Sequence, residues 1–181
     1  MNRYPVNIPE NKIGDYEVAH EGDVTHLKLD GRSIMSDREQ EYHEHQHFLP
    51  HAHGHILSAG LGLGMIHTPL MQNENFKSIT IVENSQEVID LVWDHCPKDK
   101  RFNLVFDDIY NYSPTQKFDI GWFDSWIGFD PDNQRAKNTP HYSEIYERDM
   151  KERFGKHCEK LLFWRASGVD WIRYIVYPLA T

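Results

Sequence analysis

Cysteine and long apolar runs are both scarce in this chain of 181 residues. The two cysteines, Cys96 and Cys158, lie far apart and form no C-x-x-C pair, which argues against a disulfide framework and a thiolate zinc site. No apolar run reaches the ~18 residues of a membrane-spanning helix, and the first residues, MNRYPVNIPENK, lack the apolar stretch of a signal peptide. The sequence therefore predicts a cytoplasmic protein with no membrane partner and two reduced thiols.

Positive charge is also in deficit, with 19 Lys and Arg against 28 Asp and Glu and a formal net charge of -9. Such a surface does not attract a phosphate backbone or an anionic membrane, so nucleic acid is disfavoured as a partner. Cationic small molecules are favoured instead. The length is that of one domain with enough chain to bury a core.

The first part of the chain has the pattern of short antiparallel strands. Residues 15–36 form alternating or β-branched stretches, interrupted by Glu21-Gly22-Asp23 and by Asp30-Gly31, which is a strong hairpin signal. We expect a small β-meander that occupies residues 1–40 as an N-terminal extension, with residues 41–181 forming the main unit. An exposed hairpin edge is compatible with a homodimer.

Beyond a polar, helical stretch over residues 37–49, strands alternate with helices. The expected strands are 55–59, 78–82, 103–106, 118–123 and 160–164, and a helix over 86–95 follows a Ser85 cap. A further helix begins at Thr139-Pro140. Its stripe facing the sheet is expected to contain Tyr142, Ile145, Tyr146, Met150, Phe154 and Cys158. This alternation predicts an α/β, Rossmann-like doubly wound fold, with a mostly parallel sheet and helices on both faces.

The first predicted strand opens into a glycine-rich turn, and the second ends on an acid. Gly60, Gly62 and Gly64 leave room for a ligand beside backbone N–H groups. Glu83, at the tip of the second strand, can accept hydrogen bonds from both ribose hydroxyls of an adenosine. An acid here disfavours a ligand with a 2′-phosphate, and the glycine spacing fits a nucleoside better than a dinucleotide.

The third and fourth predicted strands also end on acids. Asp107 and Asp108 follow the third, where Asp108 can accept the exocyclic amine of adenine, and Asp124 follows the fourth. Ligands of such sheets bind at the carboxyl ends of the strands, next to the switch in strand order. Any one of these acids could be a solvated loop residue, but together they predict a nucleoside site with Asp124 at its reacting end.

The strand-ending series ILSAGLGLG, SITIVE, NLVFDD and KFDIGWFDSW resembles the class I S-adenosylmethionine-dependent transferase superfamily. Residues 26–49, HLKLDGRSIMSDREQEYHEHQHFL, are similar to a segment of spermidine synthases and related aminopropyltransferases. In that family a leucine-aspartate-glycine turn precedes an acidic tract and a tyrosine-histidine-glutamate motif, which Tyr42-His43-Glu44 matches. The resemblance covers residues 14–168.

What the resemblance implies for the donor is a site for S-adenosylmethionine or its decarboxylated form. The three glycines would lie at the sulfonium side, Glu83 on the ribose, and Asp107 with Asp108 beside the adenine. No metal is implied. The partner would be a small-molecule acceptor, most simply an amine.

For the acceptor, the resemblance implies that Asp124 is the catalytic group that binds and deprotonates the attacking amine. Tyr42 and Glu44 would belong to the acceptor side. Trp126 could form a wall of that pocket, since an aromatic face attracts a cation, although filling the core is the commoner role of such a ring.

Three departures from the family pattern are visible. Leu63 replaces an aspartate of the glycine loop, which removes a charge-assisted contact worth about 1.5 to 3 kcal/mol. The turn after Asp124 reads Ser125-Trp126-Ile127-Gly128 in place of a serine-rich turn with a second acid, and the chain ends soon after the fifth strand. The usual methyltransferase pattern is not met cleanly either, because many such enzymes have an acid at the position of Ser58.

Several functions stay open on this evidence. The leading one is a transferase that moves a methyl group from an adenosyl-sulfonium donor to a small, cationic acceptor, favoured slightly by the loss of acid at Leu63. Aminopropyl transfer, as in spermidine synthases, is the alternative reaction. From another class comes a non-catalytic nucleoside-binding protein that has lost its acceptor-site acids.

Histidines crowd the segment between residues 43 and 55, at every second position except 49. On a helix, His43 and His47 would share one face, and imidazoles with the nearby carboxylates suit zinc, nickel or iron. A metal-binding regulator is therefore a third hypothesis. The required intervening glutamate spacing is absent, so surface rings and rings at the substrate entrance are the simpler interpretation.

Overall fold

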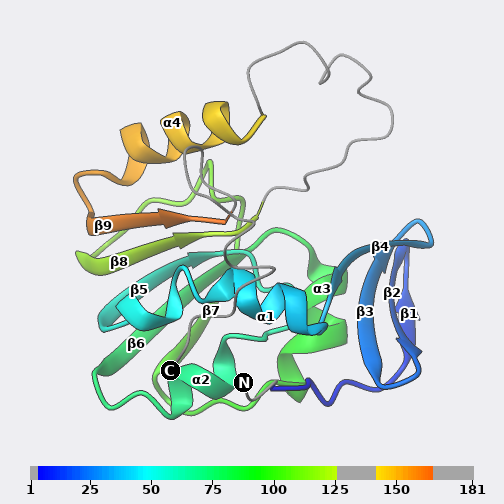
Figure 1. Ribbon diagram of the computed structural model, residues 1–181. Helices are drawn as coiled ribbons and strands as arrows, with labels where there is room; N and C mark the ends of the chain where they lie inside the picture. The colour runs from blue at the N-terminus through cyan, green and yellow to red at the C-terminus, as the bar shows by residue number, and fades with distance from the viewer. Residues whose placement is uncertain (1–3, 126–141, 165–181) are drawn as a thin grey trace.

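The computed structural model describes residues 4–125 and 142–164, which form two sheets (Figure 1). The N-terminal sheet is an antiparallel meander in the order β1-β2-β3-β4. Its strands are β1 (Asn11–Ile13), β2 (Tyr16–Glu21), β3 (Val24–Leu29) and β4 (Arg32–Ser36). The predicted meander is confirmed, including its Asp30-Gly31 turn, where both residues have positive φ, 50° and 74°, as a two-residue type I′ hairpin turn requires.

The second sheet is parallel and has the order β7-β6-β5-β8-β9. Its strands are β5 (Gly54–Ala59), β6 (Phe76–Glu83), β7 (Phe102–Phe106), β8 (Phe118–Phe123) and β9 (Cys158–Phe163). The first strand of the unit is central, and the chain moves outward from it on one side and then on the other. This is the doubly wound Rossmann order, with the switch in strand order between β5 and β8. The predicted fold class is confirmed.

Helices cover both faces of the parallel sheet (Figure 1). One face packs against α1 (Glu39–His45), α2 (His67–Met71) and α3 (Gln86–Val92), and the opposite face against α4 (Tyr142–Phe154). The strands are apolar on both sides, so that in β5 Ile56 belongs to the first core and Leu57 to the second. Two-sided burial explains why these strands lack the strict alternation of a half-exposed sheet.

Helix α3 begins where its sequence predicts. The Ser85 hydroxyl accepts a hydrogen bond from the Val88 N–H at 3.1 Å, which satisfies one of the unpaired donors of the first turn. The helix continues as a 3-10 turn, η2 (Trp93–His95), and the polar stretch before the sheet contains α1 followed by η1 (Leu49–His51).

The expected apolar stripe of α4 is correct at its centre and wrong at two positions. Tyr146, Met150 and Phe154 are buried at the i, i+4, i+8 spacing of one helical face. Ile145 lies one position off that face and is 38% exposed. Cys158 is not helical, because the helix ends at Phe154 and Cys158 begins β9. The Thr139-Pro140 start lies outside the described residues.

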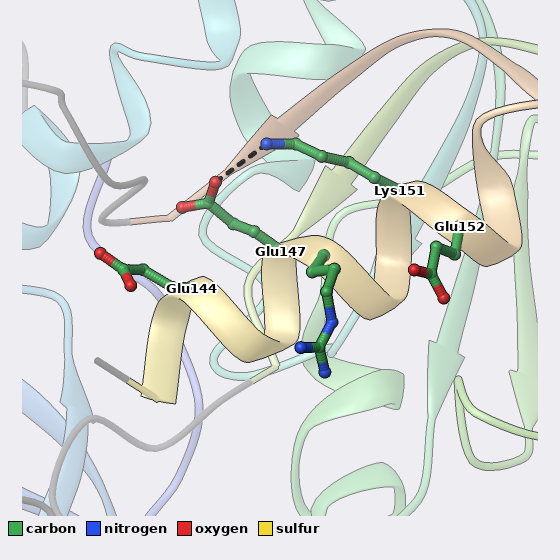
Figure 2. Close-up of a pocket in the computed structure, with 5 residues that line it drawn as sticks. Glu144, Glu147, Lys151 and Glu152 are labelled. Atoms are coloured by element: carbon green, nitrogen blue, oxygen red, sulfur yellow. Dashed lines mark hydrogen bonds and ion pairs between the residues drawn. The ribbon is translucent and has the colours of Figure 1, made fainter. Parts of the chain in front are cut away.

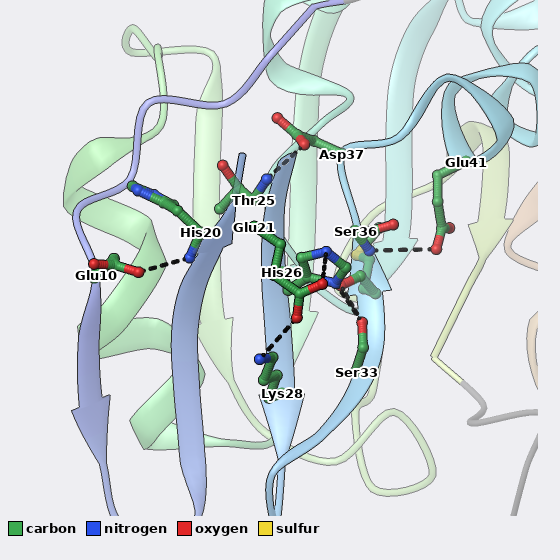
Figure 3. Close-up of polar contacts among 11 residues, drawn as sticks. Glu10, His20, Glu21, Thr25, His26, Lys28, Ser33, Ser36, Asp37 and Glu41 are labelled. Carbon is green, nitrogen blue, oxygen red and sulfur yellow. Dashed lines mark hydrogen bonds and ion pairs between the residues drawn. The ribbon is translucent and has the colours of Figure 1, made fainter. Parts of the chain in front are cut away.

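Side chains of the β4–α1 connection and of α1 itself join the meander to the main unit (Figure 3). The Asp37 carboxylate accepts hydrogen bonds from the N–H groups of Val6, at 3.1 Å, and Thr25, at 2.8 Å. The Glu41 carboxylate accepts one from the Ser36 N–H at 3.3 Å. Helix α3 also packs against β1 and β2. Within the described ranges, no helix has both the length and the apolar character needed to cross a membrane.

Candidate functional site at the carboxyl ends of the strands

Backbone hydrogen bonds hold the strand ends of the parallel sheet together. The Gly60 N–H donates to Val82 O at 2.9 Å, and the Asp124 N–H donates to Ala59 O at 3.2 Å. On the outer side, the Asp107 N–H donates to Glu83 O at 3.1 Å. The glycine loop, Glu83, the Asp107-Asp108 pair and Asp124 therefore lie along one edge, as the sequence predicts.

Gly60 is the point at which the glycine loop touches the end of β8. Its φ is +93°, a conformation that side chains disfavour, and a Cβ placed on it would lie 2.8 Å from the Asp124 carbonyl oxygen. Since that oxygen belongs to the backbone, it cannot swing away. Glycine is needed here so that the loop can approach Asp124.

Gly62 is covered by a residue of the meander. A Cβ at Gly62, whose φ is +52°, would lie 2.5 Å from the Met35 sulfur. The same sulfur accepts a hydrogen bond from the Leu63 N–H at 3.3 Å. The N-terminal sheet thus contributes one side chain to the glycine loop, and this residue had not been expected there.

Glu83 holds the glycine loop in place. Its two carboxylate oxygens accept the N–H groups of Leu61, at 2.8 Å, and Ser85, at 2.9 Å, and the residue is only 8% exposed. A carboxylate offers about four acceptor positions, two of which these amides use. Glu83 can therefore both brace the loop and accept ribose hydroxyls.

Asp107 and Asp108 are half-buried and organise the turn after β7. The Asp107 carboxylate accepts the Asp108 N–H at 2.8 Å, and the Asp108 carboxylate accepts the Tyr110 N–H at 2.8 Å. Beside them, Phe106 is 60% exposed although it is a large apolar residue. In the sheet register Phe106 is paired with Glu83, so both side chains leave the same face of the sheet.

Asp124 faces a buried histidine. The Asp124 Oδ2 atom lies 3.4 Å from His45 Nε2, and the Asp124 side chain is 19% exposed whereas that of His45 is 4% exposed. The contact joins α1 to the end of β8. The imidazole ring of His45 also lies 6.1 Å from the ring of Trp122.

Two further acids of α1 surround this pair. Glu44 is 1% exposed, and its carboxylate accepts a hydrogen bond from the Trp164 indole N–H at the end of β9. Burial raises the pKa of Glu41 to about 7, with Asp124 and Glu44 adding to the rise and His45 opposing it. Burial alone would lower the pKa of His45, but Asp124, followed by Glu41 and Glu44, outweighs it and raises that pKa. Glu41 and His45 therefore retain protons that exposed side chains would release at the same pH.

The residues predicted for the acceptor side are only partly brought together. Glu44 lies near His45 and Asp124. Tyr42 instead packs in the core against Tyr4, with ring centroids 5.4 Å apart. Helix α1 contacts Asp124 through His45, and nothing in the sequence distinguishes His45 from the neighbouring histidines. Trp126 lies outside the described residues.

The histidine-rich segment does not gather into a metal centre. Helix α1 ends at His45, so His47 does not share a helical face with His43. His43 is buried and lies 3.6 Å from Glu39, while burial lowers the pKa of His47. In the part of the chain that the structure describes, no group of three or more His, Cys, Asp or Glu residues is arranged to hold a metal ion.

Three contributors to this edge were missed by sequence reasoning. They are Met35 over the glycine loop, His45 against Asp124, and Glu41 behind it. No local motif marks them, because each acts on a residue distant in the sequence. A weak signal exists for two of them, since the α1 stretch combines acids with histidines on a helix that must face the sheet.

A hollow beside α4 is a poor candidate for the site. Figure 2 shows its lining, which consists of charged residues of that one helix: Glu144, Glu147, Arg148, Lys151 and Glu152. Lys151 donates to the Glu147 carboxylate at 3.1 Å. An i, i+4 pair of this kind is usual on a helix surface, and none of the strand-end residues takes part.

The comparisons with known proteins add a likeness of fold. No protein-family model matches the chain, and no curated protein matches it. Among solved structures it is similar to spermidine synthase from Thermotoga maritima, with 16% identity, a TM-score of 0.45 and coverage of 63% of this chain and 46% of that one. It is also similar to a spermidine synthase bound to the transition-state analogue AdoDATO, with 15% identity, a TM-score of 0.49 and coverage of 78% of this chain and 55% of that one.

A third solved structure is a proposed RNA methyltransferase from Pyrococcus horikoshii, with 13% identity, a TM-score of 0.47 and coverage of 75% of this chain and 64% of that one. The chain spans less than two thirds of each of these three structures. At these identities the likeness concerns the fold alone.

Proposed function

We propose that this protein is a transferase that binds an adenosyl-sulfonium donor and transfers its methyl group to a small, cationic amine acceptor. The donor would lie along the ends of β5, β6 and β7, and the acceptor beside the end of β8. The acidic surface, with a formal net charge of -9, favours a cationic acceptor over nucleic acid.

One observation carries this proposal. The glycine loop that would receive the sulfonium end touches the backbone of Asp124 at Gly60, while Glu83 binds the same loop at Leu61. Glu83, which would bind the ribose, and Asp124, which would bind the amine, thus lie on opposite sides of one loop. A donor that spans from Glu83 to the loop would present its reactive carbon toward Asp124.

The residues fit the chemistry of such a reaction. The sulfonium donor supplies a carbon that is already activated, so the protein need only align an unprotonated amino group of the acceptor with it and accept a proton. The Asp124 carboxylate is partly exposed and can hold the incoming amine by a charge-assisted hydrogen bond. As the C–N bond forms and the C–S bond breaks, the electron pair leaves with the sulfur and the amine proton passes to Asp124.

An exposed ring beside Glu83 supports the adenosine position. Phe106 leaves the sheet on the same face as Glu83 and is 60% exposed. An aromatic face offers a stacking surface for any base, worth about 1 to 3 kcal/mol in nucleic-acid complexes. We place the adenine between Phe106 and the turn formed by Asp107 and Asp108.

Methyl transfer is preferred over aminopropyl transfer because of the composition of the loop. Leu63 replaces the acid that would hold an aminopropyl ammonium group, and the atom that meets its N–H is the Met35 thioether. A neutral thioether gives a cationic chain end no ion-pair partner. The carboxylated donor has a carboxylate next to its own ammonium group, so it needs no acid of the loop to offset that charge.

Calorimetric titration tests both the site and the reaction. The wild-type protein is titrated with S-adenosylmethionine, decarboxylated S-adenosylmethionine, S-adenosylhomocysteine and methylthioadenosine. We expect the carboxylated pair to bind more tightly. Tighter binding of the decarboxylated donor and methylthioadenosine would indicate aminopropyl transfer, and no binding of any of the four would overturn the adenosyl site.

A second candidate, a nucleoside-binding protein without catalytic activity, is favoured by one specific observation. The loop and its acids are already paired within the chain, since Glu83 accepts two amides and Met35 accepts the Leu63 N–H. Such pairing suits a binding module whose pocket need not drive a reaction. Turnover with any amine acceptor, measured as release of S-adenosylhomocysteine, would exclude it.

A further inference from the structure

One imidazole and two carboxylates of α1 lie beside the predicted catalytic acid, Asp124. His45 lies on α1 with its side chain 4% exposed, and its Nε2 atom is 3.4 Å from Asp124 Oδ2. Glu41 and Glu44 belong to the same helix, and their negative charges raise the pKa of the same imidazole.

Protonation of His45 reduces the excess of negative charge among these groups. Three carboxylates in a buried environment repel one another, and burial disfavours every charged form. A protonated imidazole offsets one of the negative charges, and the rise in the pKa of Glu41 neutralises a second acid at low and neutral pH. The remaining acids are Glu44, which accepts a hydrogen bond from the Trp164 indole, and Asp124, whose side chain is 19% exposed.

We propose that His45 is the positioning residue of Asp124: its imidazolium holds the Oδ2 atom, which fixes the orientation of the carboxylate and keeps it ionised for the acceptor amine. This inference rests on the proposed function, because it assigns a role within the same reaction.

In the reaction, the Asp124 carboxylate would contact His45 on one side and the acceptor amine on the other. The pair with His45 fixes the carboxylate from the protein side, and the exposed part of the side chain meets the amine. When the C–N bond forms, the amine proton moves to the Asp124 carboxylate and then to solvent. His45 neither gives up nor receives a proton in this step, so its effect is on orientation and on the acidity of Asp124.

The pH response follows from the groups that face His45. They are Asp124 at the end of β8, and Glu41 and Glu44 on α1. Loss of the imidazolium charge removes an opposite charge from beside Asp124, which raises the pKa of an acid by about 1 to 3 pH units. The pH below which activity falls should then move upward.

The test uses two substitutions of His45 and a matched control. His45→Gln keeps a side chain that can donate a hydrogen bond but carries no charge, and His45→Leu removes both. The control is His47→Gln, two residues further along and outside α1. For each protein we would measure kcat and KM for the amine across pH 5 to 9, the affinity for S-adenosylmethionine, and the titration of the Asp124 carboxyl carbon by NMR.

We expect His45→Gln to lower kcat about tenfold at neutral pH and His45→Leu about a hundredfold, with donor affinity unchanged. In both variants the acid limb of kcat and the Asp124 carboxyl titration should move upward by about one pH unit or more, while His47→Gln leaves them unchanged. A structural role alone would lower thermal stability without moving either titration.

An Asp124 titration that is identical in wild type and His45→Gln would overturn the inference, whatever the enzyme does with its donor. Absence of donor binding by the wild-type protein would overturn the proposed function instead. The NMR measurement needs no turnover, so the two failures are distinguishable.

Discussion

The two halves of the candidate site are constructed in different ways. On the donor side, carboxylates bind backbone N–H groups of nearby loops, as Glu83 does with Leu61 and Ser85. On the acceptor side, side chains bind one another across the fold, as Glu44 does with Trp164, 120 positions away in the sequence. The donor half is thus neutralised by fixed dipoles, whereas the acceptor half collects titratable groups.

This difference teaches where pH and mutation should act. Backbone amides hold a carboxylate at any pH above its own pKa, so the donor half should be insensitive to pH near neutrality. The acceptor half contains Glu41 and His45, both of which retain protons longer than exposed groups do. Charge changes should therefore alter catalysis and pH response on one side, and geometry should dominate on the other.

The largest expected effect is that of Asp124→Asn on turnover. The variant keeps the shape of the side chain but loses the negative charge that binds and deprotonates the amine, so kcat should fall by about 100-fold or more. Donor affinity should stay unchanged. Asp119→Asn is the matched control, because Asp119 lies on the same strand at its opposite end and accepts the His55 N–H there. If Asp124→Asn kept its turnover, the charge of Asp124 would not be needed to bind and deprotonate the amine, and the contrast between the two halves would be wrong.

Next in size is the geometric test of the donor loop. Gly60→Ala would force a Cβ against the Asp124 carbonyl at a φ of +93° and should lower the free energy of unfolding by about 3 kcal/mol. Gly62→Ala meets only the movable Met35 side chain and should cost about 1 kcal/mol. Urea denaturation of both variants measures the difference, and equal costs would contradict the close approach of the loop to β8.

Glu41→Gln tests the titratable character of the acceptor half. The folded-state pKa of Glu41, about 7, is raised above its ordinary 4.5, so the native state binds a proton that the unfolded chain releases. The wild-type protein should therefore lose stability as pH rises from about 4.5 to 7, and the variant should lose about 2 kcal/mol less. The free energy of unfolding at pH 5 and pH 8 measures this.

Glu39→Gln, on the exposed first turn of the same helix, is the control for Glu41→Gln and should leave the pH dependence as in wild type. If Glu41→Gln and wild type have the same slope between these two pH values, Glu41 does not retain its proton in the fold.

The smallest expected effect concerns Phe106→Ala. Because the ring is 60% exposed, its loss should leave the free energy of unfolding nearly unchanged. Loss of stacking on adenine should weaken donor binding about fivefold, close to 1 kcal/mol. Ile145→Ala on the exposed side of α4 is the control. Unchanged donor affinity in Phe106→Ala would place the adenine elsewhere.

The same contrast explains what the sequence could predict. Strands, the Ser85 cap, the hairpin turn and the strand-end acids are marked by local patterns, and the structure has them where these patterns lie. The donor half consists of such local features. Ile145 was misassigned because a single helical step separates a buried from an exposed position.

The acceptor half could not be predicted in the same way. Which face of α1 meets β8 depends on how the meander directs the chain into the helix, through Asp37 and Glu41. The pairing of His45 with Asp124 and the placement of Met35 over the glycine loop follow from that packing. Because histidine recurs throughout this segment, the sequence does not indicate which of the histidines contacts Asp124.

The central claim is that donor and acceptor are held by separate acids on the two sides of one glycine loop. The most direct measurement is calorimetric titration of S-adenosylmethionine into the wild-type protein, Glu83→Gln and Asp124→Asn, with folding checked by circular dichroism. Loss of the charge at Glu83 should weaken binding at least about tenfold, since a charged hydrogen bond contributes roughly 1.5 to 3 kcal/mol, while Asp124→Asn should bind as wild type does. Wild-type affinity in Glu83→Gln would contradict the claim.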